Sequence, residues 1–211
     1  MAQLFFYFDQ TRCMGCDTCT VQCKDFNGIK PGPVRWRSVR TVEEGAFPYT
    51  KVYNTVYSCN HCENPACIPA CGKNAISKDE ATGAVIIDRK VCSELGDCIS
   101  ACPYSAIAIA DNEQEATLEA WETAHPAQKC DMCHERITKQ IAQGKKPEPA
   151  CVASCIQRAL DFGTEEELMA KYNGLGDVAR YTNGEVKGFP GDRAPSVTNT
   201  RPCIIIRRKQ I

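Results

Sequence analysis

Cysteine spacing constrains this chain more than any other feature of its sequence. Sixteen of the 211 residues are cysteine, and all of them except Cys203 fall into four groups. In chain order the groups are Cys13-x2-Cys16-x2-Cys19-x3-Cys23, Cys59-x2-Cys62-x4-Cys67-x3-Cys71, Cys92-x5-Cys98-x3-Cys102, and Cys130-x2-Cys133 followed after 17 residues by Cys151-x3-Cys155. The fold must therefore bring many thiols together within short loops.

Three kinds of chemistry use dense cysteines. A disulfide framework belongs to small secreted chains and has no reason to repeat two-residue spacings. A structural zinc site takes paired cysteines and stops at four ligands. In a ferredoxin-type loop three closely spaced cysteines ligate one iron–sulfur cluster, and the fourth, three residues later, ligates the neighbouring cluster. The first group matches that pattern at all four positions, so we predict iron–sulfur clusters. A zinc-stapled interaction module is the disfavoured alternative.

Composition supports a cofactor-filled interior and excludes some functions. With the cysteines set aside, the hydrophobic share falls from 43 % to roughly 36 %, which is thin for a chain that buries most of its surface on folding. The net charge of −1 argues against a polybasic nucleic-acid-binding protein. No apolar run approaches the length of a membrane span. The opening run Leu4–Phe8 has no charged leader and no small-residue cleavage site, so we expect no export signal.

Two local patterns recur around the cysteine groups. A short apolar strand ends in aspartate four residues before Cys13 and again before Cys92, in Phe6–Asp9 and Val85–Asp88. After the last cysteine of three groups, an Ala-Ile or Ala-Leu step indicates a helical turn that leads into a short strand, at Ala75-Ile76, Ala106-Ile107 and Ala159-Leu160. The repeats predict an α+β, loop-rich fold with duplicated bacterial dicluster ferredoxin-like domains.

The order of the groups predicts three parts of the chain. Groups two and three form one ferredoxin-like unit over residues 51–110. Groups one and four flank it and meet to form a second unit from residues 1–50 and 111–165. Residues 166–211 form a C-terminal arm that packs against the body or a partner. A short helix is expected at Glu165–Met169, capped by Thr164, and the polar, alanine-bearing segment 113–124 also allows a helix.

The four groups, taken in this order, resemble a specific family. The motif sequences are Cys59-Asn60-His61-Cys62-Glu63-Asn64-Pro65-Ala66-Cys67 and Lys129-Cys130-Asp131-Met132-Cys133. They resemble the four-cluster iron–sulfur electron-transfer (beta) subunit of the molybdopterin, or dimethyl sulfoxide reductase-type, oxidoreductases. Its members include the small subunits of dimethyl sulfoxide, polysulfide and respiratory nitrate reductases. The resemblance covers about residues 3–165.

The resemblance implies that each cluster takes cysteines from two groups. The implied ligand sets are Cys13, Cys16, Cys19 and Cys155 for cluster 1; Cys23, Cys130, Cys133 and Cys151 for cluster 2; Cys59, Cys62, Cys67 and Cys102 for cluster 3; and Cys71, Cys92 and Cys98 for cluster 4. It also implies a near-linear chain of clusters. Cluster 1 would lie nearest the catalytic subunit, and cluster 4 nearest a quinone-linked membrane subunit or another electron donor or acceptor.

One position departs from the fullest family pattern. Leu95 stands where the third group would carry a further cysteine, and leucine cannot ligate iron. We therefore expect three [4Fe–4S] clusters and a fourth cluster that is either [3Fe–4S] or a [4Fe–4S] cluster with a non-cysteine ligand. The nearby oxygen donors are Ser93, Glu94 and Asp97. The nitrate reductase relatives also lack this cysteine and carry a three-iron cluster, which favours that form.

The remaining residues give no sign of a substrate site. There is no phosphate-binding glycine loop and no isolated nucleophile with a base, so we predict a non-catalytic subunit that carries single electrons to or from a molybdenum or tungsten bis-pterin catalytic subunit. We interpret His61 and His134 as hydrogen-bonding residues, His125 as a loop residue, and Cys203 as a buried structural cysteine.

Two points stay open at this level. A free-standing polyferredoxin that serves several partners is the main functional alternative, and it predicts a soluble monomer. The location is either the cytoplasm or, as in relatives that travel with a signal-bearing partner, the outer face of the membrane. A quinone-linked membrane anchor or a soluble donor is a further possible partner, and the family implies a role in anaerobic respiration.

Overall fold

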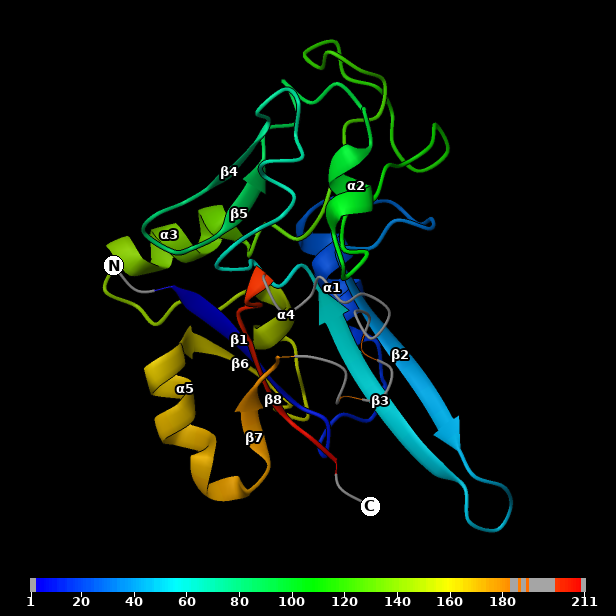
Figure 1. The fold of residues 1–211 in the computed structure, drawn as a ribbon, viewed down its shortest axis with the longest axis vertical. Coiled ribbons are helices and arrows are strands. Elements are labelled where there is room, and N and C mark those ends of the chain that lie inside the picture. The colour runs from blue at the N-terminus through cyan, green and yellow to red at the C-terminus, as the bar shows by residue number, and fades with distance from the viewer. Residues whose placement is uncertain (1–2, 183–185, 187–188, 190–199, 210–211) are drawn as a thin grey trace.

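The protein folds into short strands and helices joined by long loops. The computed structural model describes residues 3–182, 186, 189 and 200–209, and Figure 1 shows their course. The strands are β1 (Leu4–Asp9), β2 (Arg37–Glu44), β3 (Lys51–Ser58), β4 (Ile76–Lys78), β5 (Val85–Ile87), β6 (Leu160–Thr164), β7 (Val178–Arg180) and β8 (Ile204–Arg207). The helices are α1 (Thr18–Phe26), α2 (Asp97–Ala101), α3 (His134–Ala142), α4 (Ala150–Ala153) and α5 (Glu165–Tyr172), with a 3-10 turn η1 (Asn173–Leu175). The predicted mixture of short strands, short helices and loops is confirmed.

The central sheet has four strands in the order β6-β1-β8-β7. β1 pairs antiparallel with β6 and parallel with β8. All six of its residues are buried, because its two faces pack against different apolar clusters. Phe6 and Phe8 join the cluster that contains Phe162, whereas Phe5 and Tyr7 join the cluster on the other face. A strand covered on both faces has a continuous apolar sequence.

Two separate hairpins complete the β structure. β2 and β3 pair antiparallel over their whole length, from Arg37 opposite Ser58 to Glu44 opposite Lys51. Figure 1 shows this long hairpin reaching away from the rest of the molecule, and Phe47 at its tip is 95 % exposed. β4 and β5 form a short hairpin that lies with α2 at the opposite end of the view.

The strands predicted around the cysteine groups are largely confirmed. The apolar runs before Cys13 and Cys92 form β1 and β5. Ile76 begins β4 and Leu160 begins β6, as the repeat predicts. After Cys102 the chain forms only an isolated bridge, in which Ala108 pairs with Gln128. The third copy of the pattern is therefore weaker than the other two.

One of the two expected helices is present. α5 begins at Glu165, and the Thr164 hydroxyl accepts a hydrogen bond from the Glu167 amide while the Glu167 carboxylate accepts one from the Thr164 amide. These reciprocal bonds satisfy two backbone donors that a helix start leaves free. None of the described helices is long and apolar enough to cross a lipid bilayer.

The prediction that residues 113–124 could form a helix is wrong. The Asp111 carboxylate accepts hydrogen bonds from the backbone amides of Glu113 and Gln114, which holds a turn instead. The Gln114 side chain then bonds the carbonyls of Lys30 and Val34 at 3.0 and 2.9 Å. These tertiary bonds fix the segment against the loop before β2, and they override its local helical preference.

The C-terminal part of the protein is built into the sheet. β8 lies between β1 and β7, and the segment just before β8 runs along the second cysteine group. There the carbonyls of Arg201 and Thr200 accept hydrogen bonds from the amides of Glu63 and Asn64 at 2.9 and 3.0 Å. Residues distant in sequence from the cysteine groups therefore help to shape one cysteine loop.

Candidate metal centres

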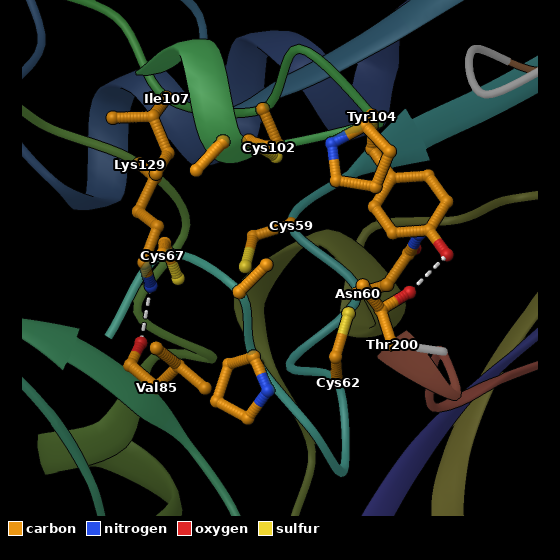
Figure 2. Close-up of a pocket in the computed structure, with 15 residues that line it drawn as sticks. Cys59, Asn60, Cys62, Cys67, Val85, Cys102, Tyr104, Ile107, Lys129 and Thr200 are labelled. Atoms are coloured by element: carbon orange, nitrogen blue, oxygen red, sulfur yellow. Dashed lines mark hydrogen bonds between the residues drawn. The ribbon is translucent and has the colours of Figure 1, made fainter. Parts of the chain in front are cut away.

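One cavity is lined by four cysteines from two sequence groups. Cys59, Cys62 and Cys67 come from the loop that follows β3, and Cys102 follows α2. Figure 2 shows the four side chains around one space, with Lys129 on one side of it. The cavity, with its opening to solvent, measures about 370 Å³. These are the four cysteines that the family resemblance assigns to cluster 3.

Polar side chains surround this cavity. Lys129 is buried, and its ammonium group donates hydrogen bonds to the carbonyls of Val85 and Cys130. Thr200 hydrogen-bonds the Cys62 side chain, and its hydroxyl lies 2.9 Å from the Tyr104 hydroxyl. The cavity therefore has a fixed cation and a hydroxyl beside its sulfur atoms.

A second cavity, of about 340 Å³, is lined by Cys13, Cys16, Cys19 and Cys155. Cys19 lies in the first turn of α1, and Cys16 is exposed. The loop makes a close approach at Gly15, which has φ +74° and whose Cβ, if present, would lie 2.7 Å from the Asn54 amide oxygen. Any other residue there would be strained and would displace Asn54. These cysteines are the set implied for cluster 1.

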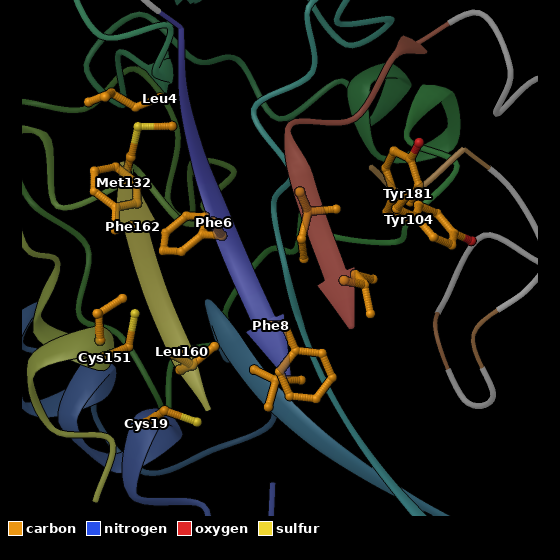
Figure 3. Packing of buried hydrophobic residues seen from close by; sticks show 14 of the residues in the cluster. Leu4, Phe6, Phe8, Cys19, Tyr104, Met132, Cys151, Leu160, Phe162 and Tyr181 are labelled. Atoms are coloured by element: carbon orange, nitrogen blue, oxygen red, sulfur yellow. The ribbon is translucent and has the colours of Figure 1, made fainter. Parts of the chain in front are cut away.

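The remaining thiols of the first and fourth groups gather beside this cavity. Cys23 lies in α1, Cys151 in α4, and Cys130 and Cys133 precede α3. All four are buried, and α1 contacts α4. Burial raises the pKa of Cys23, and the nearby thiols of Cys151 and Cys133 raise it further. Figure 3 shows Cys151 and Cys19 at the end of the apolar cluster that contains Phe162. The four buried thiols are the set implied for cluster 2.

The fourth gathering contains only three cysteines. Cys71, Cys92 and Cys98 line a cavity of about 300 Å³ together with residues 93–97. Leu95 is part of that lining and is 63 % exposed. The backbone amide of Ala127 donates a hydrogen bond to the Cys92 sulfur at 3.4 Å. The structure thus places leucine beside the three thiols, as the sequence predicts for cluster 4.

Burial shifts the acidity of these thiols. It raises the pKa to about 11 at Cys19 and Cys133, and to about 12 at Cys23 and Cys67. Burial is the largest cause in each case, and neighbouring thiols add to it because one thiolate disfavours the next. These four thiols therefore keep their protons at neutral pH unless a cation joins them, and binding a metal core releases those protons.

The donor set and its geometry fit iron–sulfur clusters. All sixteen cysteines are free thiols. Within the described residues, no three cysteine, histidine or acidic side chains converge as ligands of a single ion. In three of the four gatherings the cysteines line cavities of similar volume. Thiolates around a space of this kind suit a polynuclear core with iron at several corners.

The histidines and Cys203 have ordinary structural contacts. The His61 Nδ1 accepts a hydrogen bond from the Val85 amide at 2.9 Å, and His134 lies 3.5 Å from an Asp79 carboxylate oxygen. The His125 Nε2 is 2.8 Å from the Asn112 side-chain oxygen. Cys203 is buried in the cluster on the outer face of the sheet.

Sequence reasoning missed three polar residues beside the thiols. Lys129 and Thr200 line the cluster 3 cavity, and Arg37 lies against the thiols of the cluster 2 set. Lys129 had one signal, its place directly before Cys130. Arg37 and Thr200 are far from any cysteine motif in the sequence.

Comparison with known proteins places this protein in a family. A protein family described as "4Fe-4S dicluster domain" matches residues 50–165. A polypeptide of the anaerobic dimethyl sulfoxide reductase of Escherichia coli (strain K12) is 37 % identical over 185 residues, a match that covers 84 % of this chain and 81 % of that relative. The protein belongs to the 4Fe-4S dicluster family.

Other members of the family show the same relationship. The corresponding polypeptide of the anaerobic dimethyl sulfoxide reductase of Haemophilus influenzae is 34 % identical over 188 residues, covering 85 % of this chain and 82 % of the relative. One of the subunits of the sulfite dehydrogenase of Allochromatium vinosum is 31 % identical over 177 residues, covering 77 % of this chain and 69 % of the relative. The resemblance to iron–sulfur subunits of the dimethyl sulfoxide reductase type is confirmed.

Proposed function

We propose that this dicluster protein is an electron-transfer subunit. It carries single electrons through four iron–sulfur clusters to or from a molybdenum or tungsten bis-pterin catalytic subunit. When bound, an iron–sulfur cluster accepts and releases one electron at a time. The protein itself supplies the thiolates, the buried surroundings and the spacing, while the substrate reacts on the other subunit.

The observation that carries this proposal is the sharing of cavities between sequence groups. Cys155 lies with the first group around one space, and Cys102 lies with the second group around another. Each group thus contributes its last cysteine to a neighbouring site, which is the crossed ligation of two-cluster ferredoxins. This supports the four ligand sets implied by the family. It also supports two duplicated ferredoxin-like units, one made of residues 1–50 together with 111–165 and the other of residues 51–110, followed by the arm 166–211.

Exposure at two of the sites supports them as the two ends of the chain of clusters. At the cluster 1 site Cys16 is exposed, and Met14 and Ile156 beside it present apolar side chains to solvent. At the cluster 4 site Leu95 is exposed. The cluster 2 thiols between them are all buried. Electrons enter and leave a protein where a cluster approaches the surface, so we propose that these two sites are the ends of the chain of clusters. The family resemblance implies that the catalytic subunit lies at the cluster 1 end and the second electron partner at the cluster 4 end.

We further propose that cluster 4 is a [3Fe–4S] cluster. Leu95 occupies the lining where a fourth thiolate would stand. The neighbouring Glu94 carboxylate accepts a hydrogen bond from the Thr123 hydroxyl, so it is already engaged outside the cysteine set. Three thiolates match the three irons of such a cluster.

The test is anaerobic purification of the protein in its native complex, with iron and molybdenum or tungsten measured on the same sample. We expect about 15 iron atoms per chain and a near-isotropic electron paramagnetic resonance signal of about one spin in the oxidised state. The pterin metal should co-elute with the protein on size-exclusion chromatography. About 16 iron atoms with a silent oxidised state would instead indicate four cubanes.

Other outcomes distinguish the alternatives. An iron-replete protein that elutes as a monomer and never associates with a pterin enzyme would favour a free-standing polyferredoxin. A sample that contains zinc and no iron, although never exposed to air, would overturn the proposal as a whole.

A further inference from the structure

Arg37 is a buried cation with unused hydrogen-bond donors. It begins β2 and is only 2 % exposed. Its Nε and one terminal nitrogen, Nη2, have no hydrogen-bond partner among the described residues. An isolated charge in the interior is strongly destabilising unless an opposite charge compensates it. A buried Arg37 therefore requires a negatively charged group close by.

The packing around Arg37 holds its guanidinium group in place. Its central carbon lies 4.6 Å from the centroid of the Phe6 ring, a favourable cation–π distance. Phe6 is itself packed against Phe162, with ring centroids 5.0 Å apart. Both aromatic residues belong to the apolar cluster that also contains Cys19 and Cys151, so the ring that holds the cation packs in the same cluster as these two thiols.

The groups that Arg37 faces are thiols of the cluster 2 set. Cys151, Cys130, Cys19 and Cys23 lie close enough to Arg37 to interact with its charge. Cys133 interacts with Arg37 as well. All four thiols of the cluster 2 set and one of the cluster 1 set thus interact with this cation.

We propose that Arg37 is the buried counter-cation of cluster 2 and raises the reduction potential of that cluster. The inference rests on the proposed function, because it requires a cluster in the second set. Reduction adds one electron to a thiolate-ligated cluster that is already anionic. A fixed positive charge in a low-dielectric interior stabilises the reduced form more than the oxidised form. The two free donors are also available to sulfur atoms, and hydrogen bonds to sulfur set cluster potentials.

The experiment is a redox titration of the native complex, followed by electron paramagnetic resonance, with Arg37→Gln, Arg37→Lys and Arg40→Gln. The cluster 2 signal is identified as the one lost in Cys130→Ser. Arg37→Gln removes the charge. We therefore expect the ratio of reduced to oxidised cluster 2 at a fixed potential to fall at least tenfold, a change equal to about 59 mV for a one-electron couple. Arg40 lies on the same strand and is exposed, so Arg40→Gln should shift nothing.

Arg37→Lys separates charge from packing. Lysine keeps the positive charge, so its cluster 2 potential should stay much closer to wild type than that of Arg37→Gln. If the Arg37→Gln complex fails to load clusters, the Arg37→Lys complex with full iron content still tests the inference. A cluster 2 potential near that of the wild type supports the inference, and a tenfold fall in the ratio of reduced to oxidised cluster 2 contradicts it. Equal shifts in all four clusters, or an unchanged cluster 2 in a fully loaded Arg37→Gln complex, would also overturn it. Absence of iron from the wild-type protein would instead reject the proposed function itself.

Discussion

Cys19 and Cys23 lie one helical turn apart on α1, yet they belong to different gatherings of thiols. Cys19 lines the cavity that Cys155 also lines, whereas Cys23 lies among the buried thiols with Cys133. Helix α1 therefore contributes a cysteine to each of the two sites. An electron that passes between the two proposed clusters would cross one turn of helix, which keeps their distance fixed.

The shared helix leads to a selective effect of two closely spaced substitutions. We expect Cys19→Ser to remove or alter the cluster 1 signal and Cys23→Ser the cluster 2 signal, since each thiol faces a different set. Each variant should lose at most one cluster, roughly a quarter of the bound iron. Iron content and electron paramagnetic resonance of the reduced complex measure this. Loss of the same signal in both variants would contradict the crossed ligation.

Much of this arrangement follows from the sequence, because short-range spacing determines it. The run from Cys13 to Cys23 predicts a loop that enters a helix, and α1 begins between Cys16 and Cys19. The apolar run before Cys13 predicts β1. The order of the groups predicts which groups meet, but the assignment of individual cysteines to each cluster came from the family resemblance.

Leu95 gives a prediction about cluster type. It is exposed and lies in the lining of the cavity with Cys92 and Cys98, so its replacement should cost little stability, within about 0.5 kcal/mol. We expect Leu95→Cys to gain about one iron atom per chain and to lose the oxidised-state signal of a three-iron cluster. Leu95→Ala, which adds no ligand, is the matched control and should leave both unchanged. A wild-type protein that is already silent when oxidised would contradict this prediction.

Thr200 gives a prediction about cluster 3. Its side chain hydrogen-bonds the Cys62 side chain, which stabilises negative charge on that sulfur. Thr200→Val keeps the shape and removes a bond worth about 1 kcal/mol, so the cluster 3 potential should fall by roughly 40 mV for a one-electron couple. Tyr104→Phe removes only the neighbour of Thr200 and should shift the potential less. Redox titration measures both, and an unshifted Thr200→Val complex would show that this bond does not tune the cluster.

Residues such as Thr200 and Arg37 escape sequence reasoning for a physical reason. Thr200 reaches its cavity because β8 inserts between β1 and β7, which brings the segment before β8 against the second cysteine group. Arg37 stands in a polar, arginine-containing segment that is typical of an exposed loop, yet β2 pairing buries it. The helix expected over 113–124 fails similarly, because the side-chain bonds of Gln114 to a distant loop decide its conformation. Long-range contacts determine all three features.

Asp161 gives a prediction about stability and its pH dependence. Its carboxylate accepts hydrogen bonds from the Tyr172 hydroxyl and Lys171 at 2.7 Å and from Lys146 at 2.9 Å. Burial tends to raise its pKa, but these bonds outweigh burial and lower the pKa below the usual 3.8. The stabilisation is therefore fully present above the ordinary aspartate pKa and is lost only as pH falls through the lower folded value.

Asp161→Asn should accordingly destabilise the fold by about 1–3 kcal/mol, because the amide has one acceptor oxygen and so leaves either the Tyr172 hydroxyl or the Phe162 backbone amide without its acceptor. The cost should be the same at about pH 7 and about pH 5, since the carboxylate is ionised at both. Lys146→Gln removes a partner that is 61 % exposed, and such a pair contributes less than about 1 kcal/mol. Thermal unfolding of the wild type and both variants under anaerobic conditions, followed by circular dichroism, measures these differences. An equal loss in Lys146→Gln and Asp161→Asn would mean that the exposed ion pair, and not the buried hydroxyl, supplies the stabilisation.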